Sequence, residues 1–278
     1  MECLWHGSLA KMRVVHDDPV SYFLRDGRHE PGERTEDLPL NALLGRSVEL
    51  RFDGEIRCVA CGRALKKTVG QGFCFPCSQT RADADICMVK PELCHYFESD
   101  NPCREDGFAQ AKCFQPHVLY VSLTSGLKVG VTRRVNVPSR WIDQGAVRAV
   151  PLAEMPSRRE VGLVEHDLSR RFDDRTHWMR MLKEEHPEGD LADMAERVLD
   201  ELEVMGVPEL PEEKRVEHVF RYPVLLYPRK VESFNLDKMP VAGGVLQGIK
   251  GQYLIFDAGA INVRKFTGYR VAVHGETP

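Results

Sequence analysis

Apolar and polar residues alternate in short stretches towards both ends of the chain. Over 48–53, apolar residues alternate with charged ones before a turn at Asp53-Gly54, and this period of two is typical of a half-buried β-strand. Near the other end, the apolar run 253–256 predicts a buried strand, and the stretch from Phe266 to Val273 predicts another. Both ends are therefore expected to be rich in β-strands.

A β-hairpin is predicted in the middle of the chain. Residues 117–123 and 127–132 both alternate between outward and inward positions, and the Thr-Ser-Gly sequence at 124–126 supplies a tight turn between them. The two strands should therefore pair in antiparallel fashion.

The turn also predicts the register of this hairpin. If Leu123 pairs with Leu127, Tyr120 lies opposite Gly130 and diagonal to Lys128 on one face, within about 7–8 Å between backbones. A glycine on that face leaves the sheet open to a close approach. This face is therefore expected to be polar and shallow.

A helix, a strand and a second helix should follow the hairpin. Asn136 and Pro138 predict the start of a short helix that carries Arg140. A third strand is expected over 146–152, and Ser157-Arg-Arg-Glu160 forms a capping box that begins the second helix.

On this second helix, Glu165 lies close to the apolar stripe that runs from Val161 to Phe172. At 3.6 residues per turn it falls within roughly 60° of the centre of the stripe. Its carboxylate is then expected to point towards the sheet or its rim. The alternative is a glutamate at the edge of the stripe that reaches solvent or pairs with Arg140.

An acidic stretch at 184–217 holds 13 acidic and 3 basic residues. Apolar residues at three- and four-residue steps from Leu191 to Met205 predict one amphipathic helix within it, ended by Gly206 and Pro208. The acidic side chains most simply form the solvent-exposed face of this helix. The alternative is that they mimic DNA or bind a protein partner.

The net charge of the whole chain is −4, so the residues outside the acidic stretch carry about +6. Nucleic acid therefore stays open as a partner.

The length and composition suit a folded protein outside the membrane. The 278 residues are 42% hydrophobic and 29% charged, which predicts about two domains with a core and excludes low-complexity disorder. No apolar run approaches the 18 or so residues that span a membrane, and the stretch 1–15 lacks the layout of a signal peptide. A cytoplasmic location is expected.

The nine cysteines point to metal binding, since a cytoplasmic chain keeps its thiols reduced. Cys58-Val-Ala-Cys61 and Cys74-Phe-Pro-Cys77 are separated by 12 residues, close to the layout of zinc ribbons. A thioredoxin-like redox pair is the competing interpretation of any single C-x₂-C. Two pairs at this spacing predict a structural zinc site, because four thiolates leave no open position on the ion.

A second set of cysteines follows at wider intervals: Cys87, Cys94, Cys103 and Cys113. The gaps of 6, 8 and 9 residues match no standard ligand spacing. A second zinc site is expected here, made of four cysteines or of three with a histidine, since His95 and His117 lie beside two of them. An iron–sulfur cluster or unliganded buried cysteines are the alternatives.

The order of residues after the cysteines resembles the GIY-YIG nuclease superfamily. Val118-Leu119-Tyr120, then Lys128-Val129-Gly130, then Arg140 and Glu165 follow the order of its ββαβα core over about 65 residues. Val118 and Leu119 replace the glycine and isoleucine of the first triplet, and Lys128 replaces the second tyrosine. The whole chain, including Lys250-Gly-Gln-Tyr-Leu254, also resembles a bacterial family of unassigned function.

This resemblance implies metal-assisted hydrolysis of phosphodiester bonds. Tyr120 would act as general base or orient the attacking water, and Lys128 would lower its pKa. Arg140 would clamp the phosphate, and Glu165 would hold one Mg²⁺. Residues 128–171 carry nine basic and five acidic side chains, a balance that suits a polyanion.

The sequence therefore predicts an α+β protein in which a zinc-ribbon-like cysteine-rich segment joins a GIY-YIG-like ββαβα core between β-rich ends. The expected segments are a β-rich N-terminal region (1–57), a zinc-binding cysteine-rich segment (58–117), a GIY-YIG-like core (118–183), an acidic helical segment (184–217) and a β-rich C-terminal region (218–278). The leading function is a zinc-containing, Mg²⁺-dependent nuclease or nucleic-acid-processing enzyme that hydrolyses phosphodiester bonds of DNA or RNA. The alternatives are a non-catalytic zinc-ribbon nucleic-acid-binding protein with a degenerate nuclease core, and a thiol or iron–sulfur redox protein.

Overall fold

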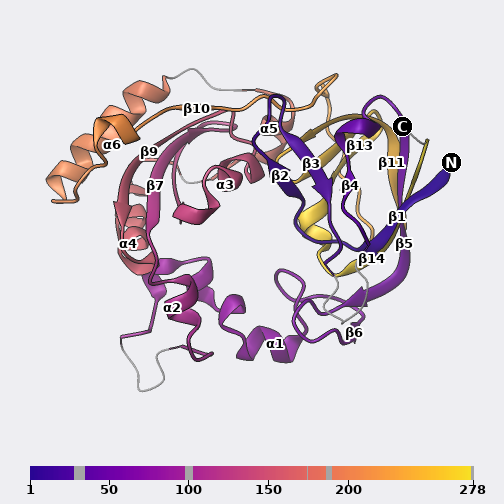
Figure 1. The fold of residues 1–278 in the computed structure, drawn as a ribbon, viewed down its shortest axis with the longest axis horizontal. Coiled ribbons are helices and arrows are strands. Elements are labelled where there is room, and N and C mark those ends of the chain that lie inside the picture. The colour runs from indigo at the N-terminus through magenta and orange to yellow at the C-terminus, as the bar shows by residue number, and fades with distance from the viewer. Residues whose placement is uncertain (28–34, 98–102, 174, 186–189, 277–278) are drawn as a thin grey trace. The chain divides into compact units, whose positions relative to one another are not determined.

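The computed structural model describes residues 1–27, 35–97, 103–173, 175–185 and 190–276. The chain divides into two compact units, and Figure 1 labels most of their helices and strands. The terminal unit combines Met1–Gln79 with Arg221–Pro278, and the central unit is Thr80–Phe220. The two cysteine sets thus belong to different units. The polar stretch from Asp26 to Asp37, with Gly27, Pro31 and Gly32, predicts a loop, and residues 28–34 of it lie outside the described residues.

The terminal unit is built on an antiparallel sheet with the strand order β1-β14-β5-β11-β12-β13, and β6 pairs with β5. A smaller sheet has the order β2-β3-β4. The strands are β1 (Glu2–Ser8), β2 (Arg13–Val15), β3 (Ser21–Leu24), β4 (Leu38–Pro39), β5 (Ser47–Arg57), β6 (Ala64–Leu65), β11 (Val241–Lys250), β12 (Tyr253–Phe256), β13 (Gly259–Asn262) and β14 (Tyr269–Gly275).

The alternation of the sequence accounts for the core of this sheet. Val48 and Leu50 of β5 are buried and lie opposite Gly275 and Val273 of β14. Full burial of such a valine or leucine side chain contributes roughly 1.5–3 kcal/mol relative to exposure. The strands expected over 48–56 and 253–256 are confirmed as parts of β5 and as β12. The turn expected at Asp53-Gly54 is wrong, because β5 continues through both residues to Arg57.

The strand expected from Phe266 to Val273 begins later than predicted. Phe266 lies in the 3₁₀ turn η7 (Val263–Phe266), and β14 begins only at Tyr269. The side chain of Asn262 caps this turn by accepting a hydrogen bond from the Lys265 N–H, and Gly268 has a φ of 89° that interrupts an extended chain. Local turn chemistry therefore overrides the apolar pattern.

The central unit holds an antiparallel sheet with the order β10-β9-β7-β8. Its helices are short apart from α4 and α6. The elements are α2 (Phe108–Lys112), β7 (His117–Leu123), β8 (Leu127–Arg133), α3 (Ser139–Asp143), β9 (Arg148–Met155), α4 (Arg158–Leu168), α5 (Trp178–Leu182), α6 (Leu191–Val204) and β10 (His218–Val219).

The two faces of this sheet differ in chemistry. Leu119 and Val121 of β7 join an apolar core with residues of α4 and α6, such as Val161 and Val198. Figure 1 shows α4 and α6 on one side of the sheet and α3 on the other. The alternating residues of β7 face α3, where the ring of Tyr120 meets that of Trp141.

The predicted hairpin register is confirmed. Leu123 pairs with Leu127, and Tyr120 pairs with Gly130. The capping box is confirmed too, because Ser157 Oγ accepts a hydrogen bond from the Glu160 N–H at 3.2 Å and begins α4. The chain thus presents two strands, a short helix, a third strand and a longer helix in that order.

Candidate functional site

Two tight turns position the first four cysteines in the terminal unit. Cys58 follows the last residue of β5, and its carbonyl accepts a hydrogen bond from the Gly62 N–H at 2.9 Å. Gly62 has a φ of 70°, a conformation that glycine adopts without steric cost. The second turn follows the bridge between Val69 and Phe73, and it leads into α1 (Phe75–Thr80), which carries Cys77.

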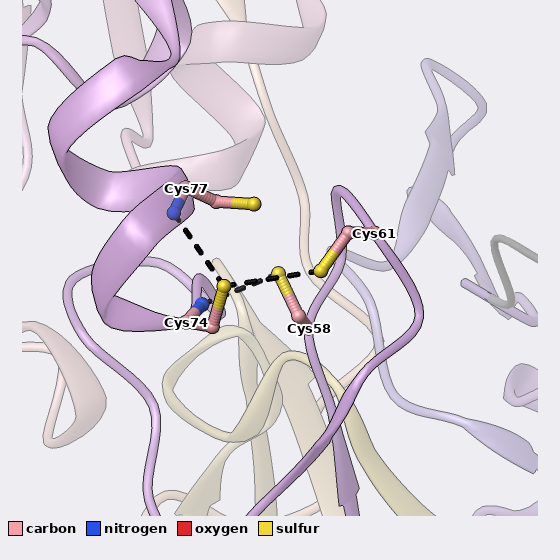
Figure 2. Close-up of side chains that lie close together, drawn as sticks. All are labelled: Cys58, Cys61, Cys74 and Cys77. Atoms are coloured by element: carbon pink, nitrogen blue, oxygen red, sulfur yellow. Dashed lines mark hydrogen bonds between the residues drawn. The ribbon is translucent and has the colours of Figure 1, made fainter.

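The four thiols converge on one point. The Sγ atoms of Cys58, Cys61, Cys74 and Cys77 all lie within 4.8 Å of one another, and those of Cys61 and Cys74 are 3.8 Å apart. Figure 2 shows the side chains gathered between the first loop and the start of α1. A tetrahedral zinc ion with Zn–S bonds of about 2.3 Å sets its sulfur atoms about 3.8 Å apart. The four cysteines therefore have the donor set and spacing to bind a metal ion such as Zn²⁺.

The protonation of this cluster reflects the crowding of its thiols. Burial opposes ionisation of Cys58, but hydrogen bonds from the backbone N–H groups of Cys74, Ala60 and Cys61 outweigh it and lower the pKa of Cys58 to about 6. Hydrogen bonding to Cys74, burial and the other thiols raise the pKa of Cys77 to about 12. The thiols by themselves thus favour ionisation of Cys58 and oppose ionisation of Cys77. A bound cation would stabilise all four as thiolates.

The second set of cysteines lines one cavity of about 30 Å³ in the central unit. All four are half-buried. Burial, the charge of Asp85, and the nearby Cys94 and Cys113 raise the pKa of Cys87 to about 12. His95 lines the same cavity, whereas His117 is not among its lining residues.

A third group of polar side chains lies on the α3 face of the central sheet. The hydroxyl of Tyr120 donates to Gln144 Oε1 at 2.9 Å, and Lys128 Nζ donates to the same oxygen at 3.0 Å. Tyr120 is 0% exposed and Lys128 is 3% exposed. A single amide oxygen thus ties the tyrosine of β7 to the lysine of β8.

Gly130 makes room for the tyrosine ring. A Cβ at this position would lie 2.7 Å from the Tyr120 hydroxyl oxygen, closer than non-bonded atoms tolerate. The ring of Trp141 meets the Tyr120 ring edge to face with centroids 5.5 Å apart, a favourable aromatic geometry. Tyr120 is therefore held between a glycine and an indole.

Arg140 and Glu165 both act electrostatically on Tyr120. Burial raises the pKa of Tyr120 to about 12; Arg140 opposes the rise, and the carboxylates of Glu165 and Asp143 add to it. The pKa of Tyr120 is thus raised overall, whereas a lowered pKa was expected beside Lys128. Removal of the phenolate from water outweighs the nearby cations, and the Lys128 ammonium is directed to Gln144.

Sequence reasoning did not select Gln144 and Asp143 as site residues. They stand three and four positions after Arg140, a spacing that places side chains on the same face of a helix. The spacing from Arg140 could therefore have identified both residues in the sequence. The site also contains Ser122 Oγ and Trp141 Nε1, which are buried without a hydrogen-bond partner among the described residues.

The fold and the cysteine cluster define a mixed α+β protein, mostly of strands, with a four-cysteine site suited to a metal such as zinc. The chain belongs to the family DUF2797, proteins of unknown function, whose model matches residues 45–271. The matched span includes all eight clustered cysteines and the Tyr120 site.

No curated protein and no solved structure matches the chain. Within the described residues, every helix is too short or too polar to cross a lipid bilayer.

Proposed function

We propose that the protein hydrolyses phosphodiester bonds of nucleic acid in a Mg²⁺-dependent reaction at the Tyr120 site. One observation carries the proposal: side chains from β8, α3 and α4 act together on the hydroxyl of Tyr120, which lies on β7. Lys128 reaches it through Gln144, and Arg140 and Glu165 alter its pKa.

The order of elements supports a GIY-YIG-like core. Strands β7 and β8, helix α3, strand β9 and helix α4 follow the ββαβα order of that superfamily. Tyr120 lies on the first strand, Gly130 on the second, Arg140 on the first helix and Glu165 on the next. Tyr120 pairs directly with Gly130, so its ring lies over the glycine and its hydroxyl has a fixed position on this face.

Each side chain has a role that follows from its chemistry. The guanidinium of Arg140 binds the scissile phosphate through paired N–H donors. The Tyr120 hydroxyl orients the attacking water, or its phenolate accepts a proton from that water. The Lys128 ammonium, held by Gln144, adds positive charge beside the phosphate.

The carboxylates suit a hard divalent cation. Glu165 is half-buried and Asp143 is 8% exposed, and both affect the Tyr120 pKa. Carboxylate oxygens are the ligands that Mg²⁺ takes in proteins. Glu165 would hold the Mg²⁺ ion, which would neutralise the charge that develops on the leaving oxygen.

The test is cleavage of single- and double-stranded DNA and RNA with Mg²⁺ or Mn²⁺. We expect cleavage by the wild type and its loss in Glu165→Gln, which is nearly isosteric and removes only charge. Asp167→Asn is the matched control, because Asp167 is exposed two positions away on the same helix. Zinc content and circular dichroism should be unchanged in both variants.

Two further variants separate the roles of the site. Tyr120→Phe should slow cleavage by roughly 10²–10⁴ with little change in affinity, the usual contribution of a positioned base. Arg140→Ala should weaken binding and also slow cleavage, because it removes the phosphate contact. A fully active Tyr120→Phe would refute the role given to the tyrosine.

A second candidate is a non-catalytic nucleic-acid-binding protein that keeps this core as a scaffold. It is favoured by the complete burial of Tyr120, whose hydroxyl already donates to Gln144. Equal residual cleavage by the wild type and Glu165→Gln would support this candidate over the enzyme. Both candidates require nucleic-acid affinity that falls steeply with salt, because phosphate neutralisation supplies it.

A further inference from the structure

We propose that Cys87, Cys94, Cys103 and Cys113 bind a second Zn²⁺ ion as four thiolates in the cavity of the central unit. All four side chains line this one cavity although they span 27 positions of the sequence. The proposal is independent of the nuclease activity proposed above.

The segment that supplies these cysteines lacks a core of its own. Among its described residues from 80 to 113, only Ala82, Asp85, Pro91 and Ala109 are buried. Several of its larger apolar side chains are exposed: Val89 is 70% exposed and Phe97 is 67% exposed. Segments that bury so little apolar surface are usually held by a metal or by disulfides.

The secondary structure of the segment is equally sparse. It consists of the 3₁₀ turns η2 (Ala82–Ala84), η3 (Ile86–Met88) and η4 (Pro91–Leu93), followed by α2. Cys87 lies in η3, Cys94 caps the C-terminus of η4 and Cys113 caps the C-terminus of α2. The cysteines thus stand where the short elements meet, so a single ion bound to all four joins them.

The size of the cavity suits an ion. Its volume is about 30 Å³, and a water-sized species needs roughly 10–15 Å³ of the same kind of volume. There is therefore room for a species of that size between the four cysteines. Four soft sulfur donors around such a space select Zn²⁺ over hard cations.

The polar neighbours favour four cysteines over three cysteines and a histidine. His95 Nε2 lies 3.5 Å from Asp85 Oδ2, so the imidazole is directed to a carboxylate. Asp85 in turn accepts a hydrogen bond from the Cys87 N–H at 3.0 Å and pairs with Arg104 Nε at 2.6 Å. Asp85 therefore positions the cysteine loop and His95 around the ion, as carboxylates do in the outer shell of metal sites.

This ion would also hold the start of α4. The Arg158 guanidinium donates to the carbonyls of Cys87 and Met88, and the Arg158 N–H donates to the carbonyl of Cys113 at 2.8 Å. Gly162 lies so close to Pro91 that a Cβ there would come within 2.2 Å of the Pro91 Cβ. The cysteine segment is thus seated on the first turns of the helix that carries Glu165.

Zinc content of the full-length chain tests the assignment. We expect two zinc ions per chain in the wild type, one in Cys103→Ser and one in Cys61→Ser, which loses a ligand of the first cluster. Cys3→Ser is the matched control and should keep two, because Cys3 is exposed and outside both sets. One zinc in the wild type, with no further loss in Cys103→Ser, would overturn the second site.

A measurement on the wild type avoids variants that fail to fold. Alkylation of the zinc-loaded protein, mapped by mass spectrometry, should label Cys3 at once, and it should label Cys87, Cys94, Cys103 and Cys113 only after a chelator removes the zinc. Equal labelling of these four before and after chelation would overturn the proposal. Iron with inorganic sulfide and a brown colour in the purified protein would also overturn it, in favour of an iron–sulfur cluster.

Discussion

The four-cysteine cluster of the terminal unit and the Tyr120 site of the central unit each bring several polar side chains together. Different interactions offset the close approach of these side chains in the two sites. In the cluster, four thiols lie within 4.8 Å and raise the pKa of Cys77 to about 12. In the Tyr120 site, Gln144 accepts hydrogen bonds from both Tyr120 and Lys128. The first group has the donors to bind a cation such as Zn²⁺, whereas the second is held by hydrogen bonds and packing within the protein.

This difference teaches where the stability of each region comes from. The cysteine turns bury little apart from Cys58, Phe73 and Cys74, so their folding free energy should come largely from the metal. The Tyr120 site lies on a sheet whose other face packs against α4 and α6, so its stability should come from apolar burial. Three substitutions test this contrast.

The largest effect is expected for Cys58→Ser. Structural zinc sites have apparent binding free energies of about 10–16 kcal/mol, so the loss of one ligand should unfold the cysteine turns and lower the zinc content. Elemental analysis and thermal unfolding measure both changes, with Cys3→Ser as the control. Unchanged zinc content and an unchanged melting temperature in Cys58→Ser would contradict the inference that a metal ion stabilises the cysteine turns.

An intermediate effect is expected for Gly130→Ala. The added methyl group would lie 2.7 Å from the Tyr120 hydroxyl, and such overpacking costs about 1–3 kcal/mol. The free energy of unfolding in urea measures it. In a double-mutant cycle, Tyr120→Ala should remove most of this cost, because the clashing ring is gone. Additive costs would show that the ring is not the source of the strain.

The smallest effect is expected for Ser157→Ala, which removes the N-cap of α4. Loss of the hydrogen bond from the Glu160 N–H should cost about 0.5–2 kcal/mol in the free energy of unfolding, with zinc content unchanged. Ser169→Ala at the other end of α4 is the matched control and should stay within about 0.5 kcal/mol of the wild type. If both variants cost the same, the cap is not stabilising the helix.

Local features were predictable because their causes lie close together in the chain. The first cysteine cluster follows from two turns separated by 12 residues, and the hairpin register follows from one tight turn. Even so, the start of β14 was predicted too early, because the Asn262 cap acts through hydrogen bonding that apolar periodicity does not report. The protonation of Tyr120 was also predicted in the wrong direction, since its complete burial is a tertiary property.

The sequence by itself determined the cysteine turns, the pairing of Tyr120 with Gly130 and the capped start of α4, because each depends on backbone geometry within a few residues of a turn or cap. Only the tertiary structure decided that Gln144 meets Tyr120 across 24 positions and that Cys87 to Cys113 share one cavity. Such contacts depend on how helices and strands pack once their loops close, and side-chain periodicity within single elements carries no record of that packing.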